Sequence, residues 1–375
     1  MNIGIDISSL VYKRGVSRYT ANLVRGLSAE GIDLSLFGYS LRQKNTLKEF
    51  VQTTRFRSTV ESRILPLPPT ALELIWRFTN WQTPEKLFPR MDVFHSWDWM
   101  QPPVSKIPVV STIHDLAVLH YPETAHPVIL RQHQHAWDYL KMKAAHLIAV
   151  SRATKNDLVE LLGYPSYLIH VVHEALPEEF RQLVDGITEE EEAAIITRLQ
   201  LSKPFILFVG TREPRKNLAR LIEAWTPLAT DFQLIVVGAA GWDGVSENQA
   251  SDQIRFLGTV SDPELSVLYG QASCFAYPSL YEGFGLPILE SFHHGTPVVT
   301  SDNSGMREVA GNAAVLVDPL SPESIRQGLL TVLNESIVEQ QQRLQRMIIR
   351  QHMFDWRRVA QETIAVYKLA LSETT

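Results

Sequence analysis

The chain has 375 residues, of which 45% are hydrophobic and 20% charged, with a formal net charge of −6; these values are typical of a soluble globular enzyme. This length fits two domains, each able to bury its own core. No apolar run is long enough to cross a bilayer, and the single cysteine, Cys274, excludes an internal disulfide. We therefore expect a cytoplasmic protein in which Cys274 lies in a hydrophobic core.

Apolar runs bounded by polar turns alternate with helical patterns along the chain. The predicted strands of the first half are residues 3–7, 92–95, 109–113, 146–150 and 169–173. Those of the second half are residues 205–209, 233–237, 254–257, 274–277, 297–300 and 314–317. Repeated strand–helix units predict an α/β protein with parallel sheets, whose ligands bind at the carboxyl ends of the strands.

The first predicted strand leads into a glycine-containing turn, Lys13-Arg14-Gly15-Val16-Ser17-Arg18-Tyr19. Gly15 has no side chain to keep a ligand away from the backbone, and Ser17 could cap the helix that follows. Further on, residues 42–63 are basic and precede Trp76, Phe78 and Trp81. This stretch fits a face that rests on an anionic membrane, and equally a solvated loop beside core aromatics.

Polar residues follow several predicted strands. The strand at 109–113 ends in His114-Asp115, where the imidazole could contact a substrate hydroxyl or move a proton and Asp115 could cap the next turn. Ser151 is a good N-cap for a helix at 152–162. Residues 177–192 are acidic and break the alternation, and Thr188 with Glu191 forms a capping-box pattern. We place the domain junction there.

Two motifs in the second half indicate an anion-binding site. The strand at 205–209 runs into a basic turn, Gly210-Thr211-Arg212-Glu213-Pro214-Arg215-Lys216-Asn217, whose cations could neutralise a diphosphate. The second motif is Tyr281-Glu282-Gly283-Phe284-Gly285-Leu286-Pro287-Ile288-Leu289-Glu290. Pro287 suits the first position of a helix, so the N–H groups of residues 284–286 would face a bound anion. Two carboxylates flanking a phosphate site fit the hydroxyl groups of a nucleotide-sugar.

The second motif resembles the E-x7-E signature of the family-4 retaining glycosyltransferases. The resemblance implies the GT-B fold, which has two Rossmann-like domains with parallel sheets facing across a cleft. The domains would span residues 1–180 and 181–353, and a C-terminal helix at 354–375 would return to the N-terminal domain. The N-terminal domain would bind the acceptor, near Gly15 and the turn at residues 97–100.

The resemblance also implies roles for individual residues. Glu282 would meet the donor sugar, with His114 near it, and Glu290 would hold the ribose. Lys216 would bind the diphosphate together with an arginine. Thr211 stands where the family has that arginine, so the role falls on Arg212 or Arg215, of which we prefer Arg212. The remaining donor-binding candidates are Gly15, Gly210, Gly283, Phe284, Gly285 and Leu286.

Other features of the sequence limit how far the family's residue roles can be assigned to this chain. His173-Glu174-Ala175 replaces the Pro-Asn-Gly often found at the domain junction, so we transfer no role to those residues. Ser17 replaces a usual second glycine, which weakens the case for close backbone approach there. The chain has no Asp-x-Asp, no G-x-G-x-x-G and no Walker motif, so we expect no metal and no cofactor.

The sequence thus predicts a retaining hexosyltransferase that acts on a nucleotide diphosphate sugar and a glycan or lipid-linked glycan acceptor. The form Glu-Pro-Arg-Lys-Asn resembles bacterial mannosyltransferases of surface-polysaccharide biosynthesis, which favours GDP-mannose as the donor. A UDP-sugar donor, a non-catalytic sugar-nucleotide-binding protein and a GT-B epimerase or phosphorylase remain alternatives. We expect no nucleic-acid partner and leave open a peripheral contact of the N-terminal domain with the cytoplasmic membrane.

Overall fold

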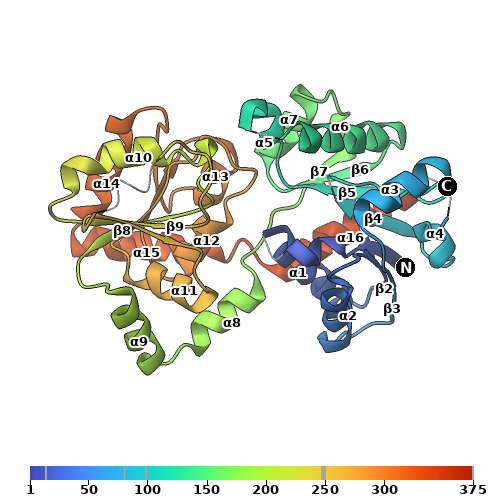
Figure 1. Ribbon diagram of the computed structural model, residues 1–375, viewed down its shortest axis with the longest axis horizontal. Coiled ribbons are helices and arrows are strands. Elements are labelled where there is room, and N and C mark those ends of the chain that lie inside the picture. Colours follow the sequence, from blue (N-terminus) through green and yellow to red (C-terminus); the bar gives the residue numbers. More distant parts are fainter. Residues whose placement is uncertain (13–14, 80, 98, 125, 246–250, 374–375) are drawn as a thin grey trace. The chain divides into compact units, whose positions relative to one another are not determined.

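The computed structural model describes residues 1–12, 15–79, 81–97, 99–124, 126–245 and 251–373. The chain forms two compact units (Figure 1). Unit 1 comprises Met1–Pro177 together with Asp355–Thr375, and unit 2 comprises Glu178–Phe354. No helix among the described residues combines the length and the apolar character that a membrane span requires.

Unit 1 is built on a parallel sheet that has seven strands within the described residues, in the order β3-β2-β1-β4-β5-β6-β7. These strands are β1 (Asn2–Asp6), β2 (Asp33–Tyr39), β3 (Val60–Leu65), β4 (Val93–Trp97), β5 (Val109–Ile113), β6 (His146–Ala149) and β7 (Ile169–Val171). The helices are η1 (Ser8–Tyr12), α1 (Gly15–Ala29), α2 (Lys44–Thr53), α3 (Pro69–Phe78), α4 (Pro84–Leu87), α5 (Ala117–His120), η2 (Pro122–Thr124), α6 (Pro127–Met142), α7 (Arg152–Glu160), η3 (Ser166–Leu168) and α16 (Trp356–Ser372).

Unit 2 repeats this plan with six described strands in the order β10-β9-β8-β11-β12-β13. These are β8 (Phe205–Val209), β9 (Gln233–Val237), β10 (Ile254–Gly258), β11 (Cys274–Tyr277), β12 (Val298–Ser301) and β13 (Val315–Val317). The helices are α8 (Glu178–Gly186), α9 (Glu189–Leu199), η4 (Pro214–Lys216), α10 (Leu218–Trp225), η5 (Thr226–Leu228), α11 (Asp262–Gln271), α12 (Leu286–His293), α13 (Ser304–Ala310), α14 (Pro322–Leu333) and α15 (Ile337–Gln351). Cys274 is fully buried in its core, as predicted.

Two strands of unit 1 do not appear among the predicted ones. β2 carries the buried polar residue Ser35, whose single hydroxyl proton is shared between Asn2 Oδ1 at 2.9 Å and Glu61 Oε1 at 3.0 Å. β3 is an edge strand in which three of the six residues are polar, so it lacks the continuous apolar run of an interior strand. The basic stretch is therefore not one solvated loop, because it contains α2 and β3.

The C-terminal helix α16 packs within unit 1, beside α1 and strands β4 to β6. His95 at the centre of β4 is fully buried and fixes this packing. Its Nδ1 lies 2.6 Å from the hydroxyl of Tyr367 on α16, and its Nε2 lies 2.9 Å from Thr112 Oγ1. Burial, with a smaller contribution from His114, lowers the pKa of His95 to about 3, so the imidazole is neutral at physiological pH.

The predicted capping residues mostly behave as expected. Ser151 accepts a hydrogen bond from Thr154 N at 3.0 Å, and Thr188 and Glu191 form a complete capping box. Asp115 accepts from Ala117 N at 2.9 Å. The prediction that Ser17 caps a helix is wrong, because α1 already begins at Gly15 and the Ser17 hydroxyl donates to Ser9 O at 2.6 Å.

Candidate active site

The centre of the candidate site in unit 2 is the carboxylate of Glu282, which is held by two cations. Lys216 Nζ lies 2.6 Å from Glu282 Oε1, and Arg215 Nη1 lies 2.8 Å from Oε2. All three side chains are largely buried. Lys216 follows β8 and Glu282 follows β11, which are neighbouring strands of the sheet. The structure thus brings together three of the predicted site residues at the carboxyl edge of the sheet.

The charge of Glu282 is fixed by these neighbours. Burial alone would raise the pKa of the carboxyl group, but the charges of Lys216 and Arg215 outweigh it and hold the pKa at about 2. Tyr277 closes the cluster, since Lys216 Nζ donates to its hydroxyl at 3.1 Å and lies 5.2 Å from its ring centroid. At physiological pH Glu282 is therefore an ionised acceptor of hydrogen bonds, poised beside two donors.

The basic turn owes its shape to glycine and asparagine. Gly210 has φ +156°, and a Cβ at neighbouring Gly238 would lie only 2.0 Å from Gly210 O, so the backbones of these two loops touch. Asn217 adopts the left-handed conformation at φ 64° and is buried. Its amide donates to Pro278 O at 2.9 Å and to Pro319 O at 2.7 Å. Asn217 thus fastens the basic turn to the loops after β11 and β13.

The glycine loop that carries Glu282 is held by the start of α13. Glu282 N donates to Ser304 Oγ at 3.2 Å, and Gly305 N donates to Glu282 O at 3.0 Å. A Cβ at Gly305 would lie 2.2 Å from Gly283 O, so only glycine fits there. Sequence reasoning did not find Ser304, Gly305 or the anchoring role of Asn217, because each acts through a backbone contact with a segment distant in the chain.

The loop leads into α12 through Gly285, whose φ of +119° strongly favours glycine. We had predicted that Pro287 occupies the first position of this helix. The helix begins at Leu286, so Pro287 occupies the second position. The Phe284 side chain is buried against Phe354, with ring centroids 5.6 Å apart, so only its backbone is placed to meet a ligand. That an anion binds at the N-terminus of α12 stays a prediction.

Glu290 and Arg212, the remaining charged candidates of unit 2, have partners other than Glu282, Lys216 and Arg215. Glu290, on α12, is buried and accepts a hydrogen bond from the Tyr269 hydroxyl at 2.9 Å. Arg212 is buried with its guanidinium over the ring of Phe256, 5.1 Å from the centroid. Arg215, and not Arg212, is therefore the arginine that stands beside Lys216 and Glu282.

In unit 1, His114 follows β5 and forms a pair with a carboxylate. Its Nδ1 lies 2.7 Å from Glu174 Oε1, and both side chains are largely buried. Because a carboxylate only accepts, Nδ1–H donates and the tautomer of the ring is fixed. The edge of Tyr19 meets the imidazole at a centroid distance of 4.8 Å, and Trp97 stacks on it at 6.3 Å. The imidazole is therefore held in one orientation from three sides.

Sequence reasoning passed over Glu174. It lies 60 positions from His114, in the tripeptide to which we transferred no role. The only signal in the sequence was its position after an apolar run, at the carboxyl end of β7.

Gly15 is the first residue of α1 and is exposed. A Cβ there would meet no atom within 4 Å, so the protein itself does not require a glycine. Its neighbours Lys13 and Arg14 lie outside the described residues, as does Asp98 in the turn at 97–100. Within the part of the chain that is described, no three His, Cys, Asp or Glu side chains gather in a way that could hold a metal ion.

Two family profiles match the chain. "Glycosyltransferase Family 4" matches residues 13–180, and "Glycosyl transferases group 1" matches residues 189–350. The chain is 31% identical over 272 residues to the O-antigen chain mannosyltransferase B of Escherichia coli, covering 69% of this chain and 70% of that protein. This chain belongs to the group 1 glycosyltransferases. It is also 28% identical over 217 residues to the O-antigen chain mannosyltransferase RfbU of Salmonella typhimurium, which covers 56% of each chain.

Solved structures confirm the fold of this glycosyltransferase. A glycosyltransferase from Rickettsia africae superposes with a TM-score of 0.70 at 17% identity, covering 99% of this chain and 98% of that one. Anabaena HepE, in complex with UDP and glucose, superposes with a TM-score of 0.71 at 16% identity, covering 98% and 99%. The predicted GT-B fold, including the C-terminal helix that returns to the N-terminal unit, is confirmed.

The pair of His114 and Glu174 gives the first prediction. We expect Glu174→Gln to lower the turnover number roughly 10- to 100-fold, because the amide removes the charge and weakens the hold on the imidazole. The Michaelis constant for the donor and the melting temperature should change little, since Gln keeps the size and an acceptor oxygen. Steady-state kinetics and calorimetry of the purified variant measure both.

Glu160→Gln, at the exposed end of α7, is the matched control and should leave both quantities unchanged. An unchanged turnover number in Glu174→Gln would show that Glu174 does not position His114 for the reaction.

Proposed function

We propose that this glycosyltransferase moves a mannosyl residue from GDP-mannose to a hydroxyl of a glycan or lipid-linked glycan, with retention of the anomeric configuration. The observation that carries the proposal is the Glu282 carboxylate buried between Lys216 and Arg215 at the carboxyl edge of a parallel sheet. The names of the Escherichia coli and Salmonella relatives support mannose as the sugar.

In this proposal the bound donor replaces the contacts that Glu282, Lys216 and Arg215 make with one another. Lys216 and Arg215 bind the diphosphate, with support from the backbone N–H groups of Phe284 to Leu286 at the start of α12. Glu282 then accepts hydrogen bonds from hydroxyl groups of the sugar. Glu290 holds the ribose, in place of its bond to Tyr269. Gly210 lets the diphosphate approach the loop after β8 closely.

The reaction needs no nucleophile from the protein. The acceptor oxygen forms a bond to the anomeric carbon while the bond from that carbon to the diphosphate oxygen breaks on the same face. The acceptor's proton passes to the departing diphosphate. Lys216 and Arg215 stabilise the negative charge that grows on this leaving group. We assign His114 as a contact of the donor sugar, and Glu174 as the residue that orients it.

A UDP-sugar donor is the main alternative, because no contact described above reads the base. It is supported by Anabaena HepE, whose crystals hold UDP and glucose. A thermal-shift panel of GDP-mannose, UDP-glucose, UDP-galactose and UDP-N-acetylglucosamine separates the donors. A ligand at 100 times its dissociation constant adds about 2.7 kcal/mol of stability. Selective stabilisation by GDP-mannose is the expected result, and selective stabilisation by a UDP-sugar would overturn the choice of donor.

Transfer itself is tested by the release of nucleoside diphosphate. Release that depends on added acceptor distinguishes a transferase from a binding protein, an epimerase and a phosphorylase. We predict that Glu282→Ala lowers this turnover by about 10²-fold or more, because the hydrogen bonds to the sugar act in the transition state. Glu223→Ala, an exposed carboxylate on α10, is the control and should behave as wild type. Near-normal turnover in Glu282→Ala would contradict the assignment of Glu282 as a contact of the donor sugar.

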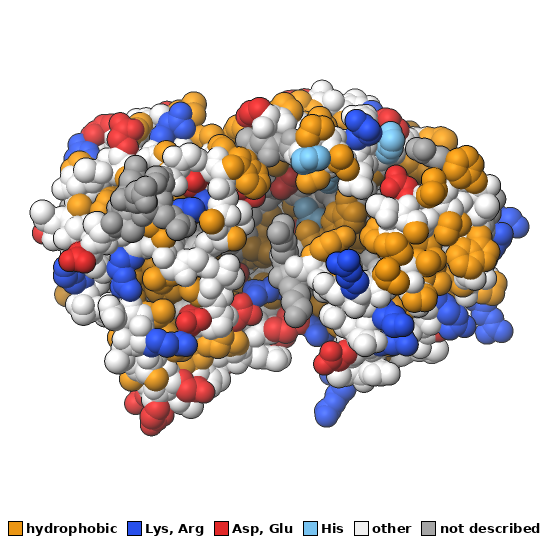
Figure 2. Space-filling model, in the orientation of Figure 1, with side chains coloured by type: hydrophobic (Ala, Val, Ile, Leu, Met, Phe, Trp, Pro, Cys, Tyr) orange, Lys and Arg blue, Asp and Glu red, His pale blue; other side chains and the backbone are white. Residues whose placement is uncertain are grey.

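We also propose that unit 1 rests on an anionic bilayer through its basic and aromatic stretch. Phe78 and Trp81 are 76% and 49% exposed, and Leu74, one turn before Phe78 on α3, is 58% exposed. Figure 2 shows hydrophobic side chains gathered on this unit, with basic side chains along the margin. Trp76, by contrast, packs inward against Phe37 and Tyr39.

Flotation with vesicles measures this contact. The chain should float with vesicles that contain phosphatidylglycerol and not with vesicles of phosphatidylcholine alone, and high salt should release it. Phe78→Ser should weaken the binding, whereas Leu320→Ser, an exposed apolar residue of unit 2, should not. Equal flotation with both kinds of vesicle, or with neither, would contradict the proposal.

A further inference from the structure

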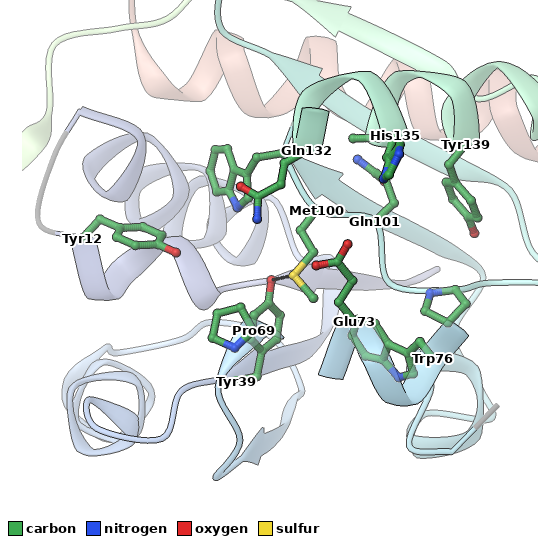
Figure 3. Close-up of a pocket in the computed structure, with 13 residues that line it drawn as sticks. Tyr12, Tyr39, Pro69, Glu73, Trp76, Met100, Gln101, Gln132, His135 and Tyr139 are labelled. Carbon is green, nitrogen blue, oxygen red and sulfur yellow. Dashed lines mark hydrogen bonds between the residues drawn. The ribbon is translucent and has the colours of Figure 1, made fainter. Parts of the chain in front are cut away.

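Unit 1 contains a cavity of about 390 Å³ beside the carboxyl ends of β1, β2 and β4 (Figure 3). Tyr39, the last residue of β2, and Trp99, just after β4, both line it. The strand order changes direction at β1, with β2 and β3 on one side and β4 to β7 on the other. Such a switch point is where open parallel sheets bind their ligands.

Aromatic rings with fixed positions form much of the wall. Tyr39 and Trp76 meet edge to face with centroids 6.3 Å apart, and Tyr12 and Trp99 do so at 6.4 Å. The Trp76 indole N–H donates to Trp81 O at 3.1 Å. These rings therefore do not need to be ordered by a ligand, and their faces suit the C–H surfaces of a sugar ring.

Three polar side chains reach into the same cavity from two helices. Figure 3 shows Gln132 and His135 entering from α6, and the Glu73 carboxylate entering from α3. Within the described residues, no hydrogen bond or ion pair holds any of the three. Gln101 and Tyr139 of the wall are instead committed, to Ser96 at 2.6 Å and to Val104 N at 2.9 Å. An amide, an imidazole and a carboxylate thus remain to pair with hydroxyl groups.

The charge of the cavity selects the class of ligand. None of its described lining residues is Lys or Arg, and Glu73 adds a negative charge, so this lining offers a phosphate no cation to pair with. The cavity is also linked to His114 by stacked rings: Trp99 stacks on Trp97 at 6.5 Å, and Trp97 stacks on His114 at 6.3 Å. Trp97 is pinned by a hydrogen bond of 2.6 Å from its indole to Asp6 O. A neutral ligand rich in hydroxyl groups, bound near His114, fits both observations.

We propose that this aromatic cavity is the acceptor subsite, and that it holds an uncharged sugar ring of the glycan between Trp76 and Trp99, with hydroxyl groups on Glu73, Gln132 and His135. The inference rests on the proposed transferase function, and it names the part of the acceptor that the enzyme recognises: a neutral sugar, not the phosphate or lipid of a lipid-linked acceptor.

The test uses Glu73→Gln and Gln132→Ala in the full chain, because neither side chain supports the fold. The probes are α-linked trisaccharides of mannose, glucose and galactose, whose binding is measured by titration calorimetry and by tryptophan fluorescence. We expect at least one trisaccharide to bind the wild type and each variant to weaken that binding about tenfold or more. With turnover, the Michaelis constant for the acceptor should rise by a similar factor at an unchanged Michaelis constant for the donor. Gln134→Ala, exposed on the same helix, is the control.

The outcomes separate this inference from the proposed function. Trisaccharide binding that weakens in the variants supports the subsite even if no donor is turned over. If both variants turn over with an unchanged Michaelis constant for the acceptor, the subsite proposal is wrong and the proposed transferase function still stands. Failure of all three trisaccharides to bind the wild type also overturns it.

Discussion

The buried ion-pair cluster of Glu282 with Lys216 and Arg215 is the interaction on which the candidate site of unit 2 depends. Removing three charges from water is costly, and only their mutual attraction and added hydrogen bonds offset that cost. The basic turn and the loop with Glu282 are also joined by hydrogen bonds to backbone oxygens. Leu280 N donates to Arg215 O at 2.8 Å, and the Arg215 side chain donates to Tyr281 O at 2.7 Å. The basic turn and the acidic loop therefore form one rigid body.

We propose that Glu282 acts as a placeholder for the substrate. Without donor, the carboxylate satisfies the two cations; with donor, a diphosphate can satisfy them and leave the carboxylate for the sugar. In unit 1, too, side chains are held in place by contacts within the protein. His114 is oriented by Glu174, Tyr19 and Trp97, and the rings of the aromatic cavity are fixed by their own contacts. In both units the groups that would meet substrate are held in place before it binds, which lowers the entropy cost of binding.

The sequence was enough to predict the α/β class, the GT-B fold and every described strand except β2 and β3, because most of those strands are continuous apolar runs such as β8 and β11. It did not indicate β2 and β3, whose partly buried contact between Ser35 and Glu61 forms only when the two strands pair. It could not tell that Arg215 pairs with Glu282 while Arg212 lies over Phe256, because both contacts join segments that are distant in the chain. It could not find Glu174, or the part that Glu73, Gln132 and His135 take in the aromatic cavity, because these side chains are brought together from distant segments.

The most direct test of the placeholder role is the affinity for free GDP, measured by calorimetry for the wild type, Glu282→Gln, Lys216→Gln and Arg215→Gln. If Glu282 competes with the diphosphate for the two cations, Glu282→Gln should bind free GDP at least as tightly as the wild type. Lys216→Gln and Arg215→Gln should bind it at least tenfold more weakly, as expected when a charge-assisted hydrogen bond worth about 1.5–3 kcal/mol is lost. Weaker binding of GDP to Glu282→Gln, or undiminished binding to both cation variants, would contradict the account.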